Sequence, residues 1–483
     1  MNFGMVQRIL GMMLLIFSLT LLVPVAVSLA YGDGHYRPFL WSTGLVAGLG
    51  AVMWLPVRRV RRDLRLRDGF LVAAVFWTVI GLSAAVPLYL SDVPDLTFTD
   101  AIFEAVSGLT TSGATVITGL DDLPKSILFY RQQLQWLGGM GIIVLAVALL
   151  PVLGIGGMSL YKAETPGPMK DQKLTPRITQ TAKAMWAIYA LLTAACALCF
   201  WLAGMSGFDA VGHAFSALST GGFSTHDASL AWFDSLPIEI IATVFMFLGG
   251  VNFTLHFTAF RRREAATYWR DTEFQAYFWI VASVVVFATL YLWLAGEYPT
   301  LGESLRYASL QVVSMQTSTG LLTSGFAHWP GALPAMLMAL TLICGCAGST
   351  AGGMKVIRWL IVFRQGVSEL KKLVHPSAEI PVKLGGRPVP QRVINAIAGF
   401  FAMYFILFAG MMFLLMTFGL DQVTAWSAVA TSINNTGPGL GDVVANFREV
   451  SDSAKWVCLI AMLVGRLEIF TLLLLLTPAF WER

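Results

Sequence analysis

The sequence predicts an all-α integral membrane protein. Its expected architecture is four tandem helix–pore loop–helix repeats around a pseudo-fourfold pore, plus two extra N-terminal transmembrane helices. Three observations predict this fold: an apolar composition, a series of long apolar runs, and a short segment that recurs four times. Of the 483 residues, 56% are hydrophobic and only 12% are charged. Soluble domains carry about 25% charged residues, so this composition indicates that most of the chain lies in a bilayer.

Ten apolar runs are long enough to cross about 30 Å of hydrocarbon as helices. The first two form a pair joined by a short polar turn, and the other eight follow at longer intervals. The expected spans are residues 9–31, 40–57, 70–91, 132–153, 182–204, 237–260, 275–296, 333–363, 393–419 and 454–480. A short start, with no small-residue cleavage site after the first run, predicts a retained span and not a signal peptide.

Basic residues gather in alternate connections between these runs. Residues 58–68 hold six arginines, and the connections 161–183, 261–273 and 354–392 hold five, four and eight basic residues. Because basic loops stay in the cytoplasm, both termini and these connections are expected there. The same charges suit anionic membrane lipid, and the longest connection could dock a soluble partner, which the sequence leaves open. Nucleic acid is not an expected partner, because no compact basic domain with interleaved aromatic residues is present.

A short segment recurs between paired spans. Residues 101–113 read AIFEAVSGLTTSG and residues 210–222 read AVGHAFSALSTGG, and the two align without a gap. Residues 308–320, ASLQVVSMQTSTG, and 425–437, AWSAVATSINNTG, are the third and fourth copies. The gapless match argues against four unrelated polar interruptions and predicts a repeated unit. The expected organisation is an N-terminal extension 1–68 followed by repeats at 69–160, 161–270, 271–390 and 391–483.

Each copy is too short to cross the bilayer, so it must enter the membrane and turn back. Such backbone is tolerated only where protein buries it or where it lines a water-filled path. Four turns on one axis can present rings of oxygen atoms that replace the hydration shell of a cation, and glycine permits the tight turn. A short helix before each turn would aim its negative C-terminal end at the ion. The predicted cation-binding residues are Thr110, Thr111, Ser112, Gly113, Ser219, Thr220, Gly221, Gly222, Thr317, Ser318, Thr319, Gly320, Asn434, Asn435, Thr436 and Gly437.

These loops resemble those of a known transporter superfamily. TTSGAT, STGGFST, TSTGLLTSGF and NNTGPGLG resemble the four selectivity-filter loops of the Trk/Ktr/HKT cation transporters. RQQLQWLGGMGIIVL, CAGSTAGGMKVIR and GRLEIFTLLLLLTPAFW resemble further signatures of the bacterial TrkH-type potassium uptake subunit. The resemblance covers nearly the whole chain, including the N-terminal pair of spans.

The resemblance implies a single-chain pore that takes up potassium, and also rubidium, across the bacterial cytoplasmic (inner) membrane. It further implies a homodimer and a cytoplasmic ring of nucleotide-binding regulatory subunits that gates the pore. In related plant proteins a serine at the first filter position goes with sodium transport, so Gly113 favours potassium. The expected bound ion is potassium, and no organic cofactor is expected in this chain.

Two features are candidates for a gate. The segment CGCAGSTAGG at 344–353 interrupts an expected span with small residues, which either unwind into a flexible blocking loop or pack helices closely. The resemblance favours the blocking loop. Arg466 lies deep in the last span, where a charge is costly, and the functional interpretation places it below the filter, hydrogen-bonded to that loop. The alternative is a structural pair with Glu468, which the spacing disfavours because residues two positions apart on a helix do not face one another. The candidate gate residues are Gly345, Ala347, Gly348, Ser349, Thr350, Gly352, Gly353, Lys355 and Arg466.

Other interpretations were weighed against a potassium pore. A sodium-selective or proton-coupled carrier of the same fold is the alternative function. An enzyme is disfavoured, because the chain has no H-E-x-x-H, P-loop or G-x-S-x-G motif and its six histidines are scattered. His213 holds the repeat position of Glu104, where polar support of a pore helix is favoured over pH sensing. Cys196 and Cys199 lie in an apolar run and are expected to be buried small residues.

Overall fold

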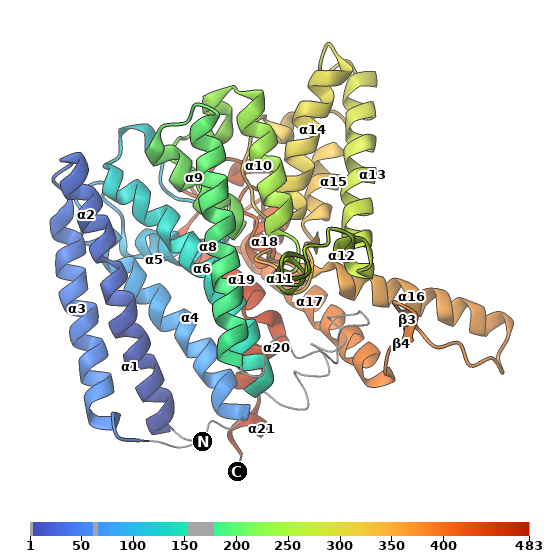
Figure 1. Cartoon of the computed structure of the whole chain (residues 1–483), viewed down its shortest axis with the longest axis horizontal. Coiled ribbons are helices and arrows are strands. Elements are labelled where there is room, and N and C mark those ends of the chain that lie inside the picture. The colour runs from blue at the N-terminus through green and yellow to red at the C-terminus, as the bar shows by residue number, and fades with distance from the viewer. Residues whose placement is uncertain (1–2, 61–65, 153–177, 483) are drawn as a thin grey trace.

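The computed structural model describes residues 3–60, 66–152 and 178–482, and helices make up most of that chain. Long helices lie side by side, and the two termini lie at the same end of the molecule (Figure 1). The N-terminal pair consists of α1 (Phe3–Thr20), its continuation α2 (Leu22–Tyr31) and α3 (Tyr36–Trp54). Gly11 and Gly50 bring α1 and α3 into backbone contact, since a Cβ on Gly11 would lie 2.8 Å from the Trp54 nitrogen.

Four helix–pore helix–helix units follow, as the repeat predicts. In each unit a long first helix is followed by a short helix, here called a pore helix, and then by an inner helix. The units are α4 (Leu66–Tyr89), α5 (Phe98–Leu109) and α6 (Lys125–Val152); α8 (Ile178–Leu202), α9 (Gly207–Ser219) and α10 (Leu236–Gly249); α13 (Thr272–Leu294), α14 (Leu301–Gln316) and α15 (Leu333–Leu340); and α17 (Gln391–Thr417), α18 (Gln422–Asn434) and α19 (Asp452–Arg466).

The pore helices begin at side-chain caps. The hydroxyl of Thr97 accepts from the backbone N–H of Asp100, and Ser206 and Thr300 cap α9 and α14 in the same way. In α18 the carboxylate of Asp421 takes this role. The first three caps share the pattern Ser/Thr-x-x-Asp/Glu, which satisfies N–H groups that the first turn of a helix leaves free. This pattern fixes where each pore helix starts.

The expected span 237–260 is wrong as a straight helix. It breaks after Gly249, and the next helix, α11 (Phe253–Arg262), is bent by 98° relative to α10. The side chain of Asn252 caps α11 by accepting from the Thr254 N–H at 2.8 Å. A Gly-Gly pair followed by a capping residue ends one helix and starts another, which overrides the apolar character of the run.

Two other expected spans are also interrupted. The span 333–363 becomes α15, a non-helical stretch 341–355 and α16 (Val356–Val374); the short strands β1 (Ile343–Cys344) and β2 (Met354–Lys355) pair in parallel within that stretch. The last span breaks at Leu467 into α19, α20 (Glu468–Leu476) and α21 (Pro478–Trp481). Within the described residues, six helices are long and apolar enough to cross a membrane, or seven with α10 and α11 taken as one.

The basic connections are only partly described. Residues 61–65 and 161–177 lie outside the described residues, as does the boundary between the first two predicted repeats. The connection after α10 contains α11 and α12 (Ala266–Trp269). The longest connection carries α16, which extends away from the other helices in Figure 1, and a hairpin of β3 (Lys383–Leu384) and β4 (Arg387–Pro388).

Ion pairs join neighbouring units away from the pore-helix C-termini. Arg306 on α14 bonds Glu239 in the first turn of α10 at 2.7 Å. Lys455 on α19 bonds Asp100 in the first turn of α5 at 2.7 Å. These pairs link the third unit to the second and the fourth unit to the first. The last unit of the chain therefore contacts the first, as in a ring of units.

Candidate functional site

The four re-entrant loops, residues 110–113, 219–222, 317–320 and 434–437, share one backbone conformation. A non-glycine residue two positions before each terminal glycine has positive φ, which is uncommon and costs energy. The angles are 53° at Thr111, 52° at Thr220, 53° at Ser318 and 53° at Asn435. The terminal glycines also have positive φ: 76° at Gly113, 88° at Gly222, 79° at Gly320 and 95° at Gly437. Four equivalent positions with the same rare geometry indicate a fourfold structure and not four separate turns.

The loops pack against one another in a closed ring. A Cβ on each terminal glycine would meet the carbonyl oxygen of the residue before the glycine in the next loop. The separations are 2.3 Å from Gly113 to Gly221 O, 2.0 Å from Gly222 to Thr319 O, 2.0 Å from Gly320 to Thr436 O, and 2.9 Å from Gly437 to Ser112 O. The fourth contact returns to the first loop. Only glycine permits this approach, so all four glycines have a structural reason to be glycine.

The recurring serine position anchors each turn through its backbone. Its carbonyl oxygen accepts from the N–H of the residue before the glycine, at 2.8 to 2.9 Å in every unit. The four bonds are Ser112 to Ser107, Gly221 to Ser216, Thr319 to Ser314, and Thr436 to Thr431. The hydroxyls of Ser107, Ser216 and Ser314 are buried and have no hydrogen-bond partner among the described residues.

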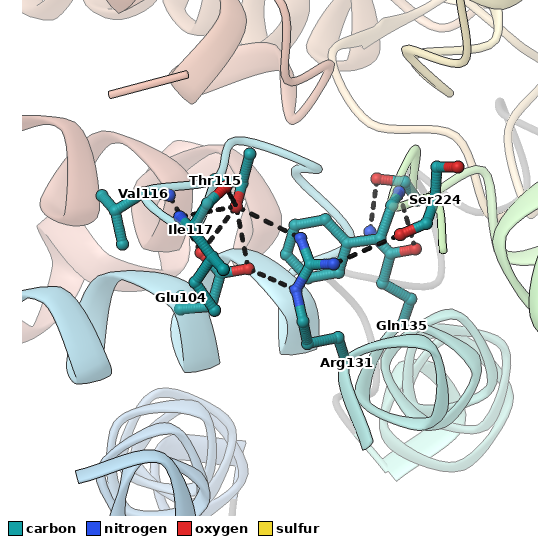
Figure 2. Close-up of polar contacts among 9 residues, drawn as sticks. Glu104, Thr115, Val116, Ile117, Arg131, Gln135 and Ser224 are labelled. Atoms are coloured by element: carbon teal, nitrogen blue, oxygen red, sulfur yellow. Dashed lines mark hydrogen bonds and ion pairs between the residues drawn. The ribbon is translucent and has the colours of Figure 1, made fainter. Parts of the chain in front are cut away.

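A buried ion pair connects the segments that follow the first and second loops (Figure 2). Glu104 on α5 accepts from Arg131 Nε at 2.7 Å, from the Val116 N–H at 3.0 Å and from the Thr115 hydroxyl at 3.0 Å. Arg131 Nη1 donates to the carbonyl oxygen of Ser224 at 3.2 Å. Both charged side chains are almost fully buried. The sequence showed Glu104 only as the counterpart of His213 and gave no sign of its partner on α6.

Gln135, also on α6, forms hydrogen bonds with the second loop and with the residue that follows it. Its Nε2 donates to the carbonyl oxygen of Gly221 at 2.6 Å, and its Oε1 accepts from the Phe223 N–H at 3.1 Å. The guanidinium of Arg131 lies 4.3 Å from the centre of the Phe223 ring. The RQQLQW motif therefore supplies two residues that hold the loop of the next unit.

His213 takes the same place in the second unit as Glu104 in the first. Its Nε2 lies 3.0 Å from the Ser224 hydroxyl, and its Nδ1 lies 2.9 Å from the carbonyl oxygen of Asp209. Both Glu104 and His213 contact a hydroxyl eleven positions later in the chain. These contacts fit polar support of a pore helix.

The 341–355 loop lies against the C-terminal ends of three pore helices. The Thr350 hydroxyl donates to the carbonyl oxygen of Leu218 at 3.0 Å. The Gly352 N–H donates to the Ser318 hydroxyl at 2.6 Å, and a Cβ on Gly352 would lie 2.2 Å from the carbonyl oxygen of Asn434. The loop thus contacts the second, third and fourth units.

Small residues in this loop allow both close packing against neighbouring backbone and backbone conformations with positive φ. A Cβ on Gly345 would lie 2.5 Å from the carbonyl oxygen of Gly250, and Gly348 and Gly353 have positive φ. The two interpretations of CGCAGSTAGG are therefore compatible. Lys355 ends the loop, and its ammonium donates to the carbonyl oxygen of Ala351 at 2.7 Å.

Arg466 ends α19 beside this loop. Its Nη1 donates to the carbonyl oxygen of Thr350 at 3.1 Å, which is the hydrogen bond that the sequence led us to expect. The side chain is 6% exposed, and its Nε and Nη2 have no hydrogen-bond partner among the described residues. A buried guanidinium with so few partners is costly, which keeps Arg466 a candidate functional residue. The side chain of Glu468 lies outside the described residues.

Comparison with known proteins agrees with this geometry. The family described as "TrkH: Cation transport protein" matches residues 43–483. The chain is 51% identical over its full length, and over the full length of the relative, to the Trk system potassium uptake protein TrkH of Halomonas elongata. It is 39% identical to TrkG of Escherichia coli, over 99% of this chain and 98% of the relative. The crystal structure of the potassium transporter TrkH from Vibrio parahaemolyticus superposes with a TM-score of 0.93 at 50% identity, covering both chains completely.

Proposed function

Because the chain belongs to the TrkH family of cation transport proteins, we propose that it takes up potassium across the bacterial cytoplasmic membrane through a channel-like pore. The four re-entrant loops form the selectivity filter of that pore. The observation that carries the proposal is the closed ring in which each terminal glycine contacts the carbonyl oxygen of the next loop. Relatives named for potassium uptake align over the full chain, which includes all four loops.

The filter binds potassium through uncharged oxygen atoms. Carbonyl, hydroxyl and amide oxygens of the four loops replace water around the ion, and the ring fixes their spacing. The pore helices add the negative ends of their dipoles from four sides. The filter accepts rubidium as well as potassium, and Gly113 in the first loop favours potassium over sodium.

The 341–355 loop and Arg466 form the gate. The loop lies across the ends of three pore helices, and the guanidinium places a positive charge beside it. A cation leaving the filter meets both a steric and an electrostatic barrier. Conduction therefore requires that the loop and Arg466 separate from their present positions.

Control of this gate comes from outside the chain. A cytoplasmic nucleotide-binding regulatory subunit docks on the basic connections, with both termini on the same cytoplasmic side. The transport subunit works as a homodimer, and its basic connections also contact anionic lipid.

Ion flux into liposomes tests the proposal. Purified protein is reconstituted with and without the regulatory subunit, and entry of radioactive rubidium is followed with potassium or sodium as competitor. We expect uptake that excess potassium blocks and sodium does not. Uptake that sodium blocks equally, or that requires an imposed proton gradient, would instead favour the sodium-selective or proton-coupled carrier. No rubidium entry with the partner present would refute a pore.

A further inference from the structure

Two structural elements outside the four re-entrant loops hold the 341–355 loop in place. One is the elbow between α10 and α11, residues 249–253. The other is Glu273 in the first turn of α13. Neither was a candidate at the level of sequence, since the elbow lay inside an expected span and Glu273 at the edge of another.

The elbow and the loop exchange hydrogen bonds in both directions. The Cys346 N–H donates to the carbonyl oxygen of Gly250 at 2.7 Å, and the Phe253 N–H donates to that of Gly348 at 3.1 Å. The Thr350 hydroxyl also donates to the carbonyl oxygen of Gly249 at 3.1 Å. The loop therefore supplies hydrogen-bond partners for backbone groups that the helix break leaves free, and the elbow does the same for backbone groups of the loop.

Glu273 joins the middle of the loop to the first turn of α16 with one carboxylate oxygen. Its Oε1 accepts from the Ala347 N–H at 2.7 Å and from the Ile357 N–H at 3.3 Å. The first donor lies in the loop and the second in the first turn of α16, where helix N–H groups lack partners within the helix. The side chain is 2% exposed, so these charge-assisted bonds form away from water, where they are stronger.

The elbow and Glu273 belong to one short stretch of chain. Only α11, α12 and their connections separate them, and His256 packs this stretch together. Its Nδ1 lies 2.8 Å from the Tyr268 hydroxyl, and its Nε2 lies 2.9 Å from the carbonyl oxygen of Leu248 at the end of α10. A displacement of α11 and α12 would therefore shift both anchors of the loop at once.

We infer that Glu273 is a positioning residue for the gate, which holds the 341–355 loop in its blocking conformation and transmits movement of α11 and α12 to it. The inference rests on the proposed function of that loop as the gate. Losing one charge-assisted hydrogen bond shifts a two-state equilibrium about tenfold. Loss of the carboxylate should thus raise the open population without changing which ion the filter prefers.

The test compares variants of the full chain in liposomes without the regulatory subunit. Glu273→Ala should raise partner-free rubidium flux about tenfold, and Glu273→Gln, which keeps a neutral acceptor oxygen, about threefold. The potassium-to-sodium preference should stay at the wild-type value, which a general loss of structure would not allow. Glu303→Ala is the control, because it removes an exposed first-turn glutamate of α14 that does not bond the loop; its flux should equal that of the wild type.

Arg466→Ala separates this inference from the proposed gate. If Arg466→Ala raises flux and both Glu273 variants behave as the wild type, the positioning role is refuted and the gate stands. If none of the three variants changes flux, the gate itself is refuted. Where Glu273→Ala is not recovered as folded protein, Glu273→Gln decides.

Discussion

The Nη1 atom of Arg466 donates to the carbonyl oxygen of Thr350 at 3.1 Å, across 116 positions of the chain. One residue ends the inner helix of the fourth unit, and the other lies in the loop that interrupts the third. The bond therefore connects the interrupted inner spans of the third and fourth units. Under the proposed function, opening of the path below the filter breaks or moves this bond.

Replacing Arg466 with alanine should open the gate in the absence of the regulatory subunit. The change removes a buried positive charge and its bond to the loop, so we expect partner-free rubidium flux to rise at least tenfold. Arg448→Ala removes an exposed arginine of the same unit and serves as the control. Flux that stays at the wild-type level in folded Arg466→Ala protein would rule out the arginine as a barrier.

Replacing Gly113 with serine should weaken the preference for potassium over sodium. A side chain there would lie 2.3 Å from the carbonyl oxygen of Gly221, at a φ of 76° that costs a non-glycine residue about 1–2 kcal/mol. The first and second loops must then move apart, which alters the spacing of the oxygen atoms. Competition between sodium and potassium for rubidium uptake measures the effect.

The control for this change is Gly48→Ser in α3, where a Cβ meets nothing within 4 Å. It should leave the preference as it is. Unchanged selectivity in Gly113→Ser would contradict the assignment of the first loop to the filter.

Replacing Glu104 with glutamine should destabilise the protein by about 3–5 kcal/mol, because it leaves the guanidinium of Arg131 buried without its counter-charge. The double variant Glu104→Gln/Arg131→Met should recover part of this loss. Thermal unfolding in detergent measures both, and Glu369→Gln gives the comparison, since its partner Lys372 is exposed and such pairs contribute about 0–1 kcal/mol. Equal stability of Glu104→Gln and wild type would show that the pair does not stabilise the segments that follow the two loops.

Acidification should loosen the contact that Asp33 makes between the α2–α3 turn and α6. Burial raises the pKa of Asp33, but hydrogen bonds from the Ser28 hydroxyl and from the Ser126 and His35 backbone N–H groups outweigh it, and the pKa is lowered overall. The folded-state pKa is thus below the unfolded value of about 4. The ionised carboxylate stabilises the fold above that value, and the stabilisation is lost as pH falls through the folded-state pKa.

The measurement is the unfolding temperature of wild type and Asp33→Asn at pH 7 and at pH 3. We expect the variant to be less stable at pH 7 and to change less between the two values. Asp92→Asn, which changes an exposed acid in the connection between α4 and α5, should follow the wild type. A variant with the same pH dependence as the wild type would exclude Asp33 as the titrating group.

The sequence was sufficient for the repeated parts of the molecule. The gapless match of 101–113 with 210–222 located the first two pore helices and their terminal glycines. Comparison with the weaker copies at 308–320 and 425–437 located the other two pore helices and their glycines. The bond from Arg466 to the loop could be expected because a buried cation needs an acceptor and residues two positions apart on a helix do not face one another. The Ser/Thr-x-x-Asp/Glu caps were also visible in the sequence and would have placed the helix starts more closely.

Features that depend on distant partners could not be predicted. The run 237–260 is apolar throughout, and its break is stabilised by N–H and hydroxyl groups of residues 346–350, about a hundred positions later. The partnership of Glu104 with Arg131 and the double contact of Glu273 likewise arise only when helices of the fold meet. Local propensity contains no information on such contacts, which is why the supports of the 341–355 loop could not be predicted.

The ring of loops belongs to a single polypeptide, and this has a consequence for genetics as well as for ion binding. In a ring of four identical subunits, one codon change alters every loop together. Here one codon change alters one of the four loops and leaves three intact. Loops can therefore be altered singly, in adjacent pairs or in opposite pairs. Such a graded set of rings would show whether ion preference falls in proportion to the number of altered loops or collapses at the first.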